Sequence, residues 1–276
     1  MLAEAFPTIS PTLSKEKMLE TYSIYHLAKE VRPFSSRPPY RAPHHSSSAT
    51  SLIGGGTFPK PGEISLAHNG ILFLDELGEF SRKTLDMLRQ PLEKGEVTIS
   101  RVRQSVTYPA KFTLIAATNP CPCGYFGSNE RYCTCTVKQV AQYQQKVSGP
   151  LLDRIDFYLP LQSVGLQNHY KGESSHTIRK RVMQAQTRQL ARMNCLNGQA
   201  SSAMLLKHLH ISEPILQFVK EICYYEKWSN RTQLKVLRIA RTIADLEGEQ
   251  SVKQAHIEEA VKWKKLVPQM GEEAYA

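Results

Sequence analysis

Four apolar residues that run directly into two adjacent carboxylates constrain this chain more than any other feature. The segment covers residues 71–76 and reads Ile-Leu-Phe-Leu-Asp-Glu. Short uninterrupted apolar runs are typical of strands that are buried on both faces of a parallel sheet. Ligands of such sheets bind outside the carboxyl ends of the strands, which is where Asp75 and Glu76 would lie. The segment therefore predicts an α/β fold with acidic side chains at its ligand-binding edge.

Acids in this position suit phosphoryl chemistry. We expect Asp75 to hold a Mg²⁺ ion and Glu76 to polarise a water molecule for attack on a phosphoryl group. This is the form of a Walker B element. Its usual companion, a phosphate loop with the pattern G-x-x-x-x-G-K-[ST], does not occur in the 276 residues. Because apolar strands that end in Asp-Glu are common, the motif alone is equally compatible with two surface acids after a core strand.

The bulk composition narrows the class of protein. The chain is 41% hydrophobic, so it can bury a core, but it contains no apolar run long enough to span a bilayer. Its first residues lack the basic region of a signal peptide, so we expect a cytoplasmic protein with no membrane partner. The net charge of +10 and the pI of about 9.3 suit a polyanionic partner, most simply DNA or another nucleic acid. The alternative is a solubility feature of a basic protein.

Alternating strand and helix signals fill the middle of the chain, which predicts an α/β sheet. A polar segment over residues 165–175 then marks a domain boundary. We therefore predict an α/β domain over residues 1–165, followed by a small all-α domain over residues 166–276. The expected elements are a strand at 71–75, a helix from Ser81, a basic-tipped hairpin over 96–107, strands at 112–117 and 155–160, and C-terminal helices that include one from about Asn230 to Glu247.

Two polar residues at predicted strand and turn positions can serve a nucleotide. Asn119 follows the strand at 112–117, so it would lie beside the two acids, where its amide can hydrogen-bond an attacking water. The alternative is a plain Asn-Pro turn. Arg154 follows a Gly-Pro break, and a guanidinium on an exposed turn can reach the nucleotide of a neighbouring subunit. The alternative is an ion pair with Asp153 or Asp156.

Arg231 is the third such residue, in the first turn of a predicted helix. A cation is disfavoured at the positive end of a helix dipole, so a nearby anion would offset that cost. A solvated surface arginine is the simpler alternative.

Four of the six cysteines are clustered in the pattern C-x-C-x9-C-x-C. They are Cys121, Cys123, Cys133 and Cys135. Two close pairs across a short loop can place four thiolates around one Zn²⁺, and such a site is structural because it has no open coordination position. The spacing of one residue within each pair is tighter than usual, so reduced structural thiols are the alternative. A disulfide is disfavoured in a reducing compartment.

Arg101 and Arg103 lie at the tip of the predicted hairpin. A basic finger that projects from an ATPase core can follow a phosphate backbone, which predicts contact with DNA. The alternative is charge that protects a strand edge. His44 and His45 are adjacent, which makes a poor metal pair, and we assign them no role from the sequence.

Taken together, these residues resemble the ComM/YifB group of the magnesium-chelatase-like AAA+ ATPases. The likeness covers nearly the whole chain. The matching segments are residues 40–45 (YRAPHH), 54–56 (GGG), 61–68 (PGEISLAH), 74–77 (LDEL), 119–124 (NPCPCG), 148–156 (SGPLLDRID) and 240–246 (ARTIADL).

The resemblance implies a role for each candidate residue. Asp75 and Glu76 look like Walker B, Asn119 like sensor 1, Arg154 like the arginine finger and Arg231 like the sensor 2 arginine. Residues 97–108 look like the pre-sensor hairpin, which lines the central pore in hexameric relatives. The family implies ATP and Mg²⁺ as ligands, a homo-hexameric ring, and ATP-driven branch migration of DNA in natural transformation and recombination.

The resemblance also implies that the AAA+ core is incomplete here. Relatives carry a Lon-protease-like domain and a Walker A loop, and Met1-Leu2-Ala3 aligns with the helix directly after that loop. The chain thus looks like the C-terminal half of the family protein, and by itself we expect it to lack ATPase activity. Sensor 2 departs slightly, because Ser-Asn-Arg-Thr stands where relatives tend to have Ser-Ala-Arg-Ala.

Three hypotheses for the function follow from these features. The first is part of a DNA-translocating AAA+ motor. The second is a non-catalytic module that binds DNA or joins a related ring. The third is a chelatase-type motor that remodels a protein for metal insertion. The basic balance and the hairpin arginines favour DNA over chelation.

Overall fold

The computed structural model describes residues 2–56, 58–100, 105–128, 131–161 and 172–265. Internal contacts divide the chain into two compact units, the first running to Ile155 and the second beginning at Asp156. The boundary expected near residue 165 stays a prediction, because residues 162–171 lie outside the described part. None of the helices described is long and apolar enough to cross a membrane.

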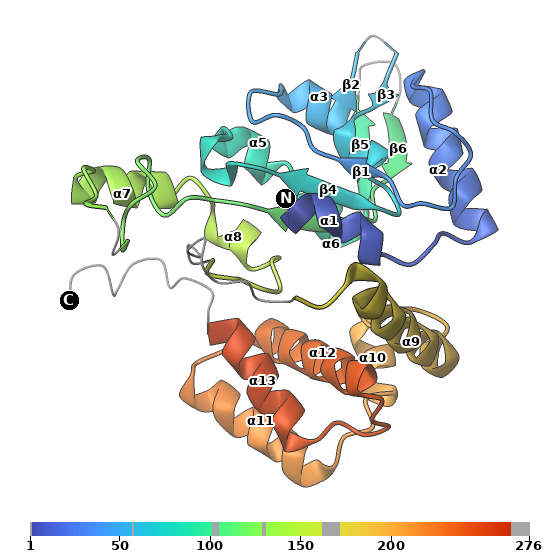
Figure 1. Cartoon of the computed structure of the whole chain (residues 1–276), viewed down its shortest axis with the longest axis vertical. Coiled ribbons are helices and arrows are strands. Elements are labelled where there is room, and N and C mark those ends of the chain that lie inside the picture. The colour runs from blue at the N-terminus through green and yellow to red at the C-terminus, as the bar shows by residue number, and fades with distance from the viewer. Residues whose placement is uncertain (1, 57, 101–104, 129–130, 162–171, 266–276) are drawn as a thin grey trace. The chain divides into compact units, whose positions relative to one another are not determined.

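The first unit is built around a three-stranded parallel sheet (Figure 1). Its strands are β1 (Tyr40–Arg41), β4 (Ile71–Leu74) and β7 (Thr113–Ala116), in the order β1-β4-β7. The register pairs Ile71 with both Tyr40 and Thr113, so the three strands point the same way. This parallel sheet with its surrounding helices confirms the predicted α/β fold class.

The central strand is buried while its neighbour β7 is partly exposed. Leu72 and Leu74 of β4 have no exposed surface, whereas Thr113 and Ala116 of β7 are exposed. The strand predicted at residues 112–117 forms over Thr113–Ala116, but it is partly exposed, not buried as an apolar run would indicate. Among the described residues β7 pairs only with β4, so its other edge has no neighbouring strand to cover it.

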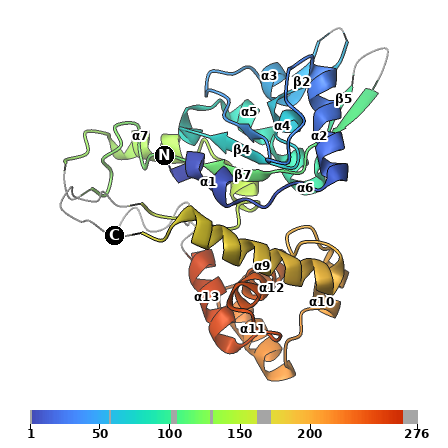
Figure 2. The same cartoon turned by 45° about the vertical axis from the view of Figure 1, so that its right-hand side comes forward.

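One face of the sheet carries the main hydrophobic core of this unit. Leu72 and Leu74 pack with Leu52, Ile64 and Leu85, which belong to the short helices α3 (Ala49–Ile53), α4 (Glu63–Leu66) and α5 (Arg82–Asp86). Figure 2 shows these three helices on the same side of β4 and β7. Because Leu72 and Leu74 are held in this core, the position at which the chain leaves the sheet after β4 is fixed.

A two-stranded hairpin completes this core, as the sequence predicted. Strand β5 (Glu96–Ser100) pairs with β6 (Ser105–Pro109) in antiparallel register, from Glu96 opposite Pro109 to Ser100 opposite Ser105. Val97, Ile99 and Tyr108 turn inward and are buried. Val97 and Ile99 are two residues apart on β5, the spacing that places side chains on the same face of a strand. Tyr108 of β6 is paired with Val97 and lies on that face too.

The connections around the sheet are short helices and a small ribbon. They are β2 (Gly54–Gly55), antiparallel to β3 (Lys60–Pro61), the 3₁₀ helix η1 (Leu77–Glu79), α6 (Arg89–Lys94), α7 (Val137–Gln144) and α8 (Gly149–Leu152). Helix α3 follows strand β1 and η1 follows strand β4, so both shape the edge at which ligands of parallel sheets bind.

The N-terminal helices are α1 (Leu2–Ile9) and α2 (Lys15–Ala28). Ser14 caps α2, its side chain accepting a hydrogen bond from the Lys17 N–H, as expected for a serine at that position. The chain after α2 braces β1, because Arg41 donates to both carboxylate oxygens of Glu63, at 2.6 Å each, and to Glu30 at 2.9 Å. These carboxylates raise the pKa of Arg41, so the guanidinium stays charged.

The second unit is helical throughout its described part, with α9 (Ser175–Met193), α10 (Ser202–Lys207), α11 (Glu213–Tyr225), α12 (Asn230–Glu247) and α13 (Gln254–Lys265). Helix α12 packs against α11 and α13 (Figure 1) and against α9 (Figure 2). Val236, Leu237, Ala240 and Ala244 form its buried stripe. Gly248, at φ 84°, ends the helix in the left-handed conformation that glycine adopts without strain.

A buried charge cluster fixes the packing of α9 on α12. Asp245 is 1% exposed and accepts hydrogen bonds from Arg192 at 2.6 and 2.8 Å, from Arg241 at 3.0 Å and from Asn197 at 2.9 Å. Burial alone would raise the pKa of Asp245, but the donors Arg192 and Asn197 and the nearby guanidinium charges outweigh it and hold the pKa below its usual value. Losing one member of such a cluster typically costs about 3–5 kcal/mol.

One local prediction near the start of this unit was wrong. Residues 155–160 do not form a strand; Phe157 instead packs edge-on against Trp263, 5.9 Å between ring centroids. The last helix begins at Gln254. The N–H of Lys253, just before it, donates to the ring of His256 in the first turn, 3.0 Å away.

Candidate functional site

The ends of the three parallel strands bring polar side chains to one edge of the sheet. Asp75 and Glu76 follow β4 directly, and both are exposed. The ladder continues past the strands, since the Ala117 N–H donates to Leu74 O at 3.0 Å and the Leu77 N–H donates to Ala117 O at 2.8 Å. Ala117 is thus still hydrogen-bonded to the chain around Asp75 and Glu76, and Asn119 lies only two residues after it.

Glu76 has an unusual backbone conformation. Its φ of 51° and ψ of 50° are left-handed, which costs a residue with a side chain roughly 1–2 kcal/mol. The Asp75 carboxylate accepts the Glu76 N–H at 2.9 Å and supports this turn. Non-glycine residues held in this region cluster at functional sites, so the strain agrees with a working role for Glu76.

A histidine from the segment after β1 reaches the same glutamate. His45 Nδ1 lies 2.9 Å from Glu76 Oε2. The His45 ring stacks on His44, 4.0 Å between centroids, and meets Phe80 edge-on at 6.4 Å. Because β1 is parallel to β4, residues that follow it arrive at the same edge. The site therefore includes His45, to which the sequence analysis assigned no role.

The residues behind the acids are fixed by α7. Tyr143 is 5% exposed and lies so close to Gly78 that a Cβ added there would stand 2.4 Å from the tyrosine Cζ. Lys146 donates to Gly78 O at 2.8 Å and lies 3.9 Å from Glu79. Burial is the main cause of the raised pKa of Tyr143, and the charges of Glu79 and Glu76 add to it. Helix α7 thus clamps the turn that carries Glu76.

The same helix also holds the chain that carries Asn119. Gln144, at the end of α7, donates to Pro120 O at 3.1 Å. Asn119 itself is exposed, and its carbonyl accepts the Thr118 hydroxyl at 3.3 Å. One helix therefore supports both strand ends.

Arg154 is folded back onto its own unit. It pairs with Glu93 of α6, and its guanidinium also donates to Pro150 O at 2.6 Å. The side chain is only 12% exposed. The carboxylate that holds it is thus Glu93, rather than Asp153 or Asp156, which sequence proximity favoured.

Arg231 lies in the first turn of α12, as predicted. It shares this end of the helix with Lys235, whose pKa is lowered chiefly by burial and further by Lys264 and Arg231. Asp156, 3.5 Å from the Lys235 amine, opposes this shift.

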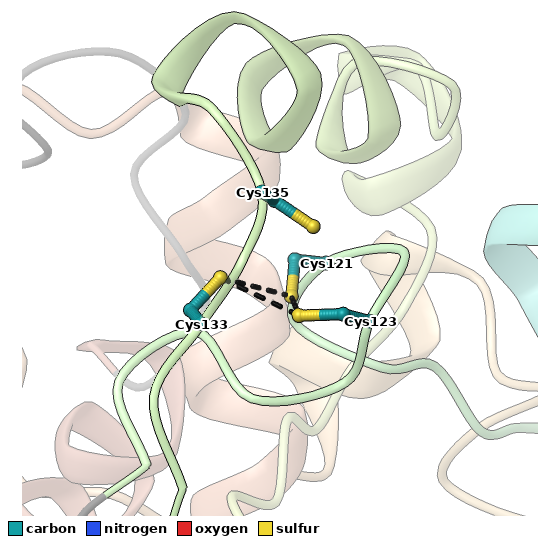
Figure 3. Close-up of side chains that lie close together, drawn as sticks. All are labelled: Cys121, Cys123, Cys133 and Cys135. Atoms are coloured by element: carbon teal, nitrogen blue, oxygen red, sulfur yellow. Dashed lines mark hydrogen bonds between the residues drawn. The ribbon is translucent and has the colours of Figure 1, made fainter.

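The four clustered cysteines point their sulfur atoms toward one another (Figure 3). All four Sγ atoms lie within 4.8 Å of one another. The main-chain N–H of Tyr125 is the chief cause that lowers the pKa of Cys123 to about 5. Although the N–H of Cys135 favours the Cys133 thiolate, burial and the neighbouring Cys123 and Cys121 raise the pKa of Cys133 to about 12. The candidate DNA-binding residues Arg101 and Arg103 lie outside the described residues.

Comparison with known protein families matches both units. The family described as "Magnesium chelatase, subunit ChlI" matches residues 1–169, and "Magnesium chelatase, subunit ChlI C-terminal" matches residues 172–264. The chain belongs to the magnesium chelatase ChlI family. The predicted resemblance is thereby confirmed.

Individual relatives within the ChlI family include proteins of the ComM/YifB group. The chain is 43% identical to YifB of Salmonella typhimurium over 96% of its own length, and 40% identical to competence protein ComM of Haemophilus influenzae over 97%. It is 25% identical to the magnesium-chelatase 38 kDa subunit of Acidiphilium rubrum over 75%. The chain spans about half the length of these relatives, 53% of the first two and 55% of the third.

Steric crowding at Gly78 gives the site a direct test. We expect Gly78→Ala to destabilise the first unit by about 1–3 kcal/mol, because the new methyl group overlaps the Tyr143 ring. Hydrogen exchange of peptides over residues 71–80 measures this, and Tyr143→Leu should reduce the effect in a double-mutant cycle.

The matched control is Gly149→Ala, since nothing lies within 4 Å of a Cβ added at Gly149. Both tryptophans of the chain, Trp228 and Trp263, belong to the second unit. The denaturation curve followed by tryptophan fluorescence should therefore be the same for Gly78→Ala as for wild type. Equal protection of residues 71–80 in wild type and Gly78→Ala would show that α7 does not clamp this turn.

Proposed function

We propose that this chain is part of a magnesium-chelatase-type AAA+ ATPase that acts on DNA, and that the β4–β7 edge is half of its nucleotide site. The observation that carries the proposal is the convergence of Asp75, Glu76 and the Asn119 segment on one edge of a parallel sheet. Ligands of such sheets bind at this edge.

The donor set suits a magnesium nucleotide. Exposed carboxylate oxygens are ligands that Mg²⁺ prefers, and a neutral amide can donate a hydrogen bond to a phosphate oxygen. In this proposal Asp75 holds the metal, Glu76 polarises the attacking water and Asn119 orients it. Bound Mg²⁺ would polarise the phosphoryl oxygens and neutralise their charge. His45, through its contact with Glu76, orients the glutamate carboxylate.

The two arginines supply positive charge in the same proposal. Arg154 acts as a finger toward the nucleotide of a neighbouring subunit, exchanging its Glu93 partner for phosphate oxygens, which the guanidinium fork fits equally well. Arg231, in the first turn of α12, acts as the sensor 2 arginine. A finger that acts in trans implies a ring, and we propose a homo-hexamer.

DNA is the partner that the charge and the relatives favour. The net charge is +10, and a relative at 40% identity carries the name competence protein. We propose ATP-driven branch migration of DNA in natural transformation and recombination as the role of the whole assembly. The weaker likeness to a magnesium-chelatase subunit, at 25% identity, favours a second candidate, a motor that remodels a protein for metal insertion.

Without a phosphate loop, the site in this chain holds ATP poorly. The loop would provide several charge-assisted hydrogen bonds, each worth about 1.5–3 kcal/mol. We therefore expect negligible steady-state ATP hydrolysis by the chain alone, with no difference between wild type and Glu76→Gln. Robust turnover that Glu76→Gln abolishes would refute this, and it would also rule out a non-catalytic module.

DNA binding separates the first candidate from the second. We expect the chain to bind DNA with a steep salt dependence, and Arg101→Gln/Arg103→Gln to lower the slope of log affinity against log salt by about 2, roughly one for each lost phosphate contact. Fluorescence anisotropy of a labelled duplex across a salt series measures both.

Lys220→Gln/Lys253→Gln is the charge-matched control, since it removes two cations from the second unit, whereas the hairpin belongs to the first. It should leave the slope unchanged. Absent binding, or equal losses in the two double variants, would favour protein remodelling over DNA.

A further inference from the structure

The four-cysteine cluster has the dimensions of a metal site. Cys121 Sγ lies 3.4 Å from Cys123 Sγ and 3.7 Å from Cys133 Sγ, and the last two are 3.5 Å apart. Zinc–sulfur bonds of about 2.3 Å in a tetrahedron put the sulfurs about 3.8 Å from one another. Cys135 completes the group, with all four sulfurs within 4.8 Å.

The same distances exclude disulfides. A disulfide needs about 2.05 Å between sulfurs, and all six cysteines of the chain are unpaired. Thiols crowded to these distances in two loops that have no regular secondary structure need a reason to converge. A shared cation supplies one, because a single ion can bind all four sulfur atoms at once.

The chemistry of the donors identifies the ion class. Thiolates are soft ligands, and a closed set of four selects Zn²⁺ or an iron–sulfur cluster over Mg²⁺ or Ca²⁺. Three sulfurs already stand at the spacing of a single tetrahedral ion, whereas an iron–sulfur cluster lies between its ligands and holds them farther apart. The observed spacing therefore favours one Zn²⁺.

The local backbone supports ligation at the first pair. Cys121 is fully buried, and its sulfur accepts the Phe126 N–H at 3.3 Å. Gly124 makes the turn between them, with φ of 83° and its N–H donating to Cys121 O at 3.0 Å. Hydrogen bonds of this kind orient a metal-bound sulfur and are a usual outer shell of zinc sites.

The position of the cluster gives it a purpose in the fold. Cys121 follows Asn119 by two residues, and Cys135 directly precedes Thr136, which caps α7 through a complete capping box with Gln139. The cluster therefore closes the loop between the end of β7 and the start of the helix that clamps the Glu76 turn.

We propose that Cys121, Cys123, Cys133 and Cys135 bind one structural Zn²⁺ that fixes the Asn119 segment to α7. The ion has no open coordination position and takes no part in chemistry. Its effect is mechanical: it holds the two supports of the candidate nucleotide edge at a constant separation. The metal site stands whether or not this edge binds nucleotide.

Metal analysis of the purified full chain tests the proposal. We expect about one zinc per chain by elemental mass spectrometry, and a loss of most of it in Cys133→Ser. Cys195→Ser is the matched control, because Cys195 is a half-buried thiol of the second unit, and it should retain the zinc of the wild type. Bound iron in place of zinc, no bound metal, or equal loss in both variants would overturn the assignment.

Hydrogen exchange tests the mechanical role, and it remains informative if Cys133→Ser folds poorly. Removing zinc from the wild-type chain with a chelator should speed exchange over residues 117–126 and 137–147 and leave α12 unchanged. Unchanged exchange in the first two segments would contradict the role. Neither readout uses nucleotide or DNA, so failure here is distinct from failure of the proposed ATPase or DNA function.

Discussion

The parallel pairing of β4 between β1 and β7 is the constraint on which the site depends. Because all three strands run the same way, each sends its following residues to the same edge. His45 follows β1, Asp75 and Glu76 follow β4, and Asn119 follows β7. The register of β4 against its neighbours is fixed, because a shift of one residue would turn Leu72 and Leu74 out of the core. Burial of these apolar side chains thus determines where the acids stand.

The edge is then held from both sides. On the β1 side, Arg41 is fixed by two carboxylates from α4 and the end of α2. On the β7 side, Tyr143 of α7 packs on the chain after β4, and Lys146, just beyond α7, donates to Gly78 O. Gln144 of α7 holds the chain after β7. These supports allow Glu76 to keep a left-handed backbone that an unsupported turn would relax. The proposed zinc ion adds to the support on the β7 side, because it would fix the Asn119 segment to α7.

The sequence predicted the parts that depend on local pattern. The apolar run before Asp75, the hairpin and the helix from about Asn230 to Glu247 all follow from local sequence pattern. It missed features that depend on pairing over distance. Strand β1 has two residues, too few for a pattern, so His45 could not be placed beside Glu76. The strand expected at 155–160 was wrong because an apolar run alone does not provide a neighbouring strand. Arg154 pairs with Glu93, which is 61 residues earlier in the chain, so sequence proximity could not indicate this partner.

The central claim, that the β4–β7 edge binds a divalent cation through Asp75, is tested most directly by paramagnetic broadening in amide NMR spectra of the chain with Mn²⁺ in place of Mg²⁺. The account predicts broadening concentrated on residues 75–77 and 117–119. It also predicts that Asp75→Asn removes this broadening, and that Glu79→Gln, which removes a nearby exposed carboxylate, does not. Broadening centred elsewhere, or unchanged by Asp75→Asn, would contradict it.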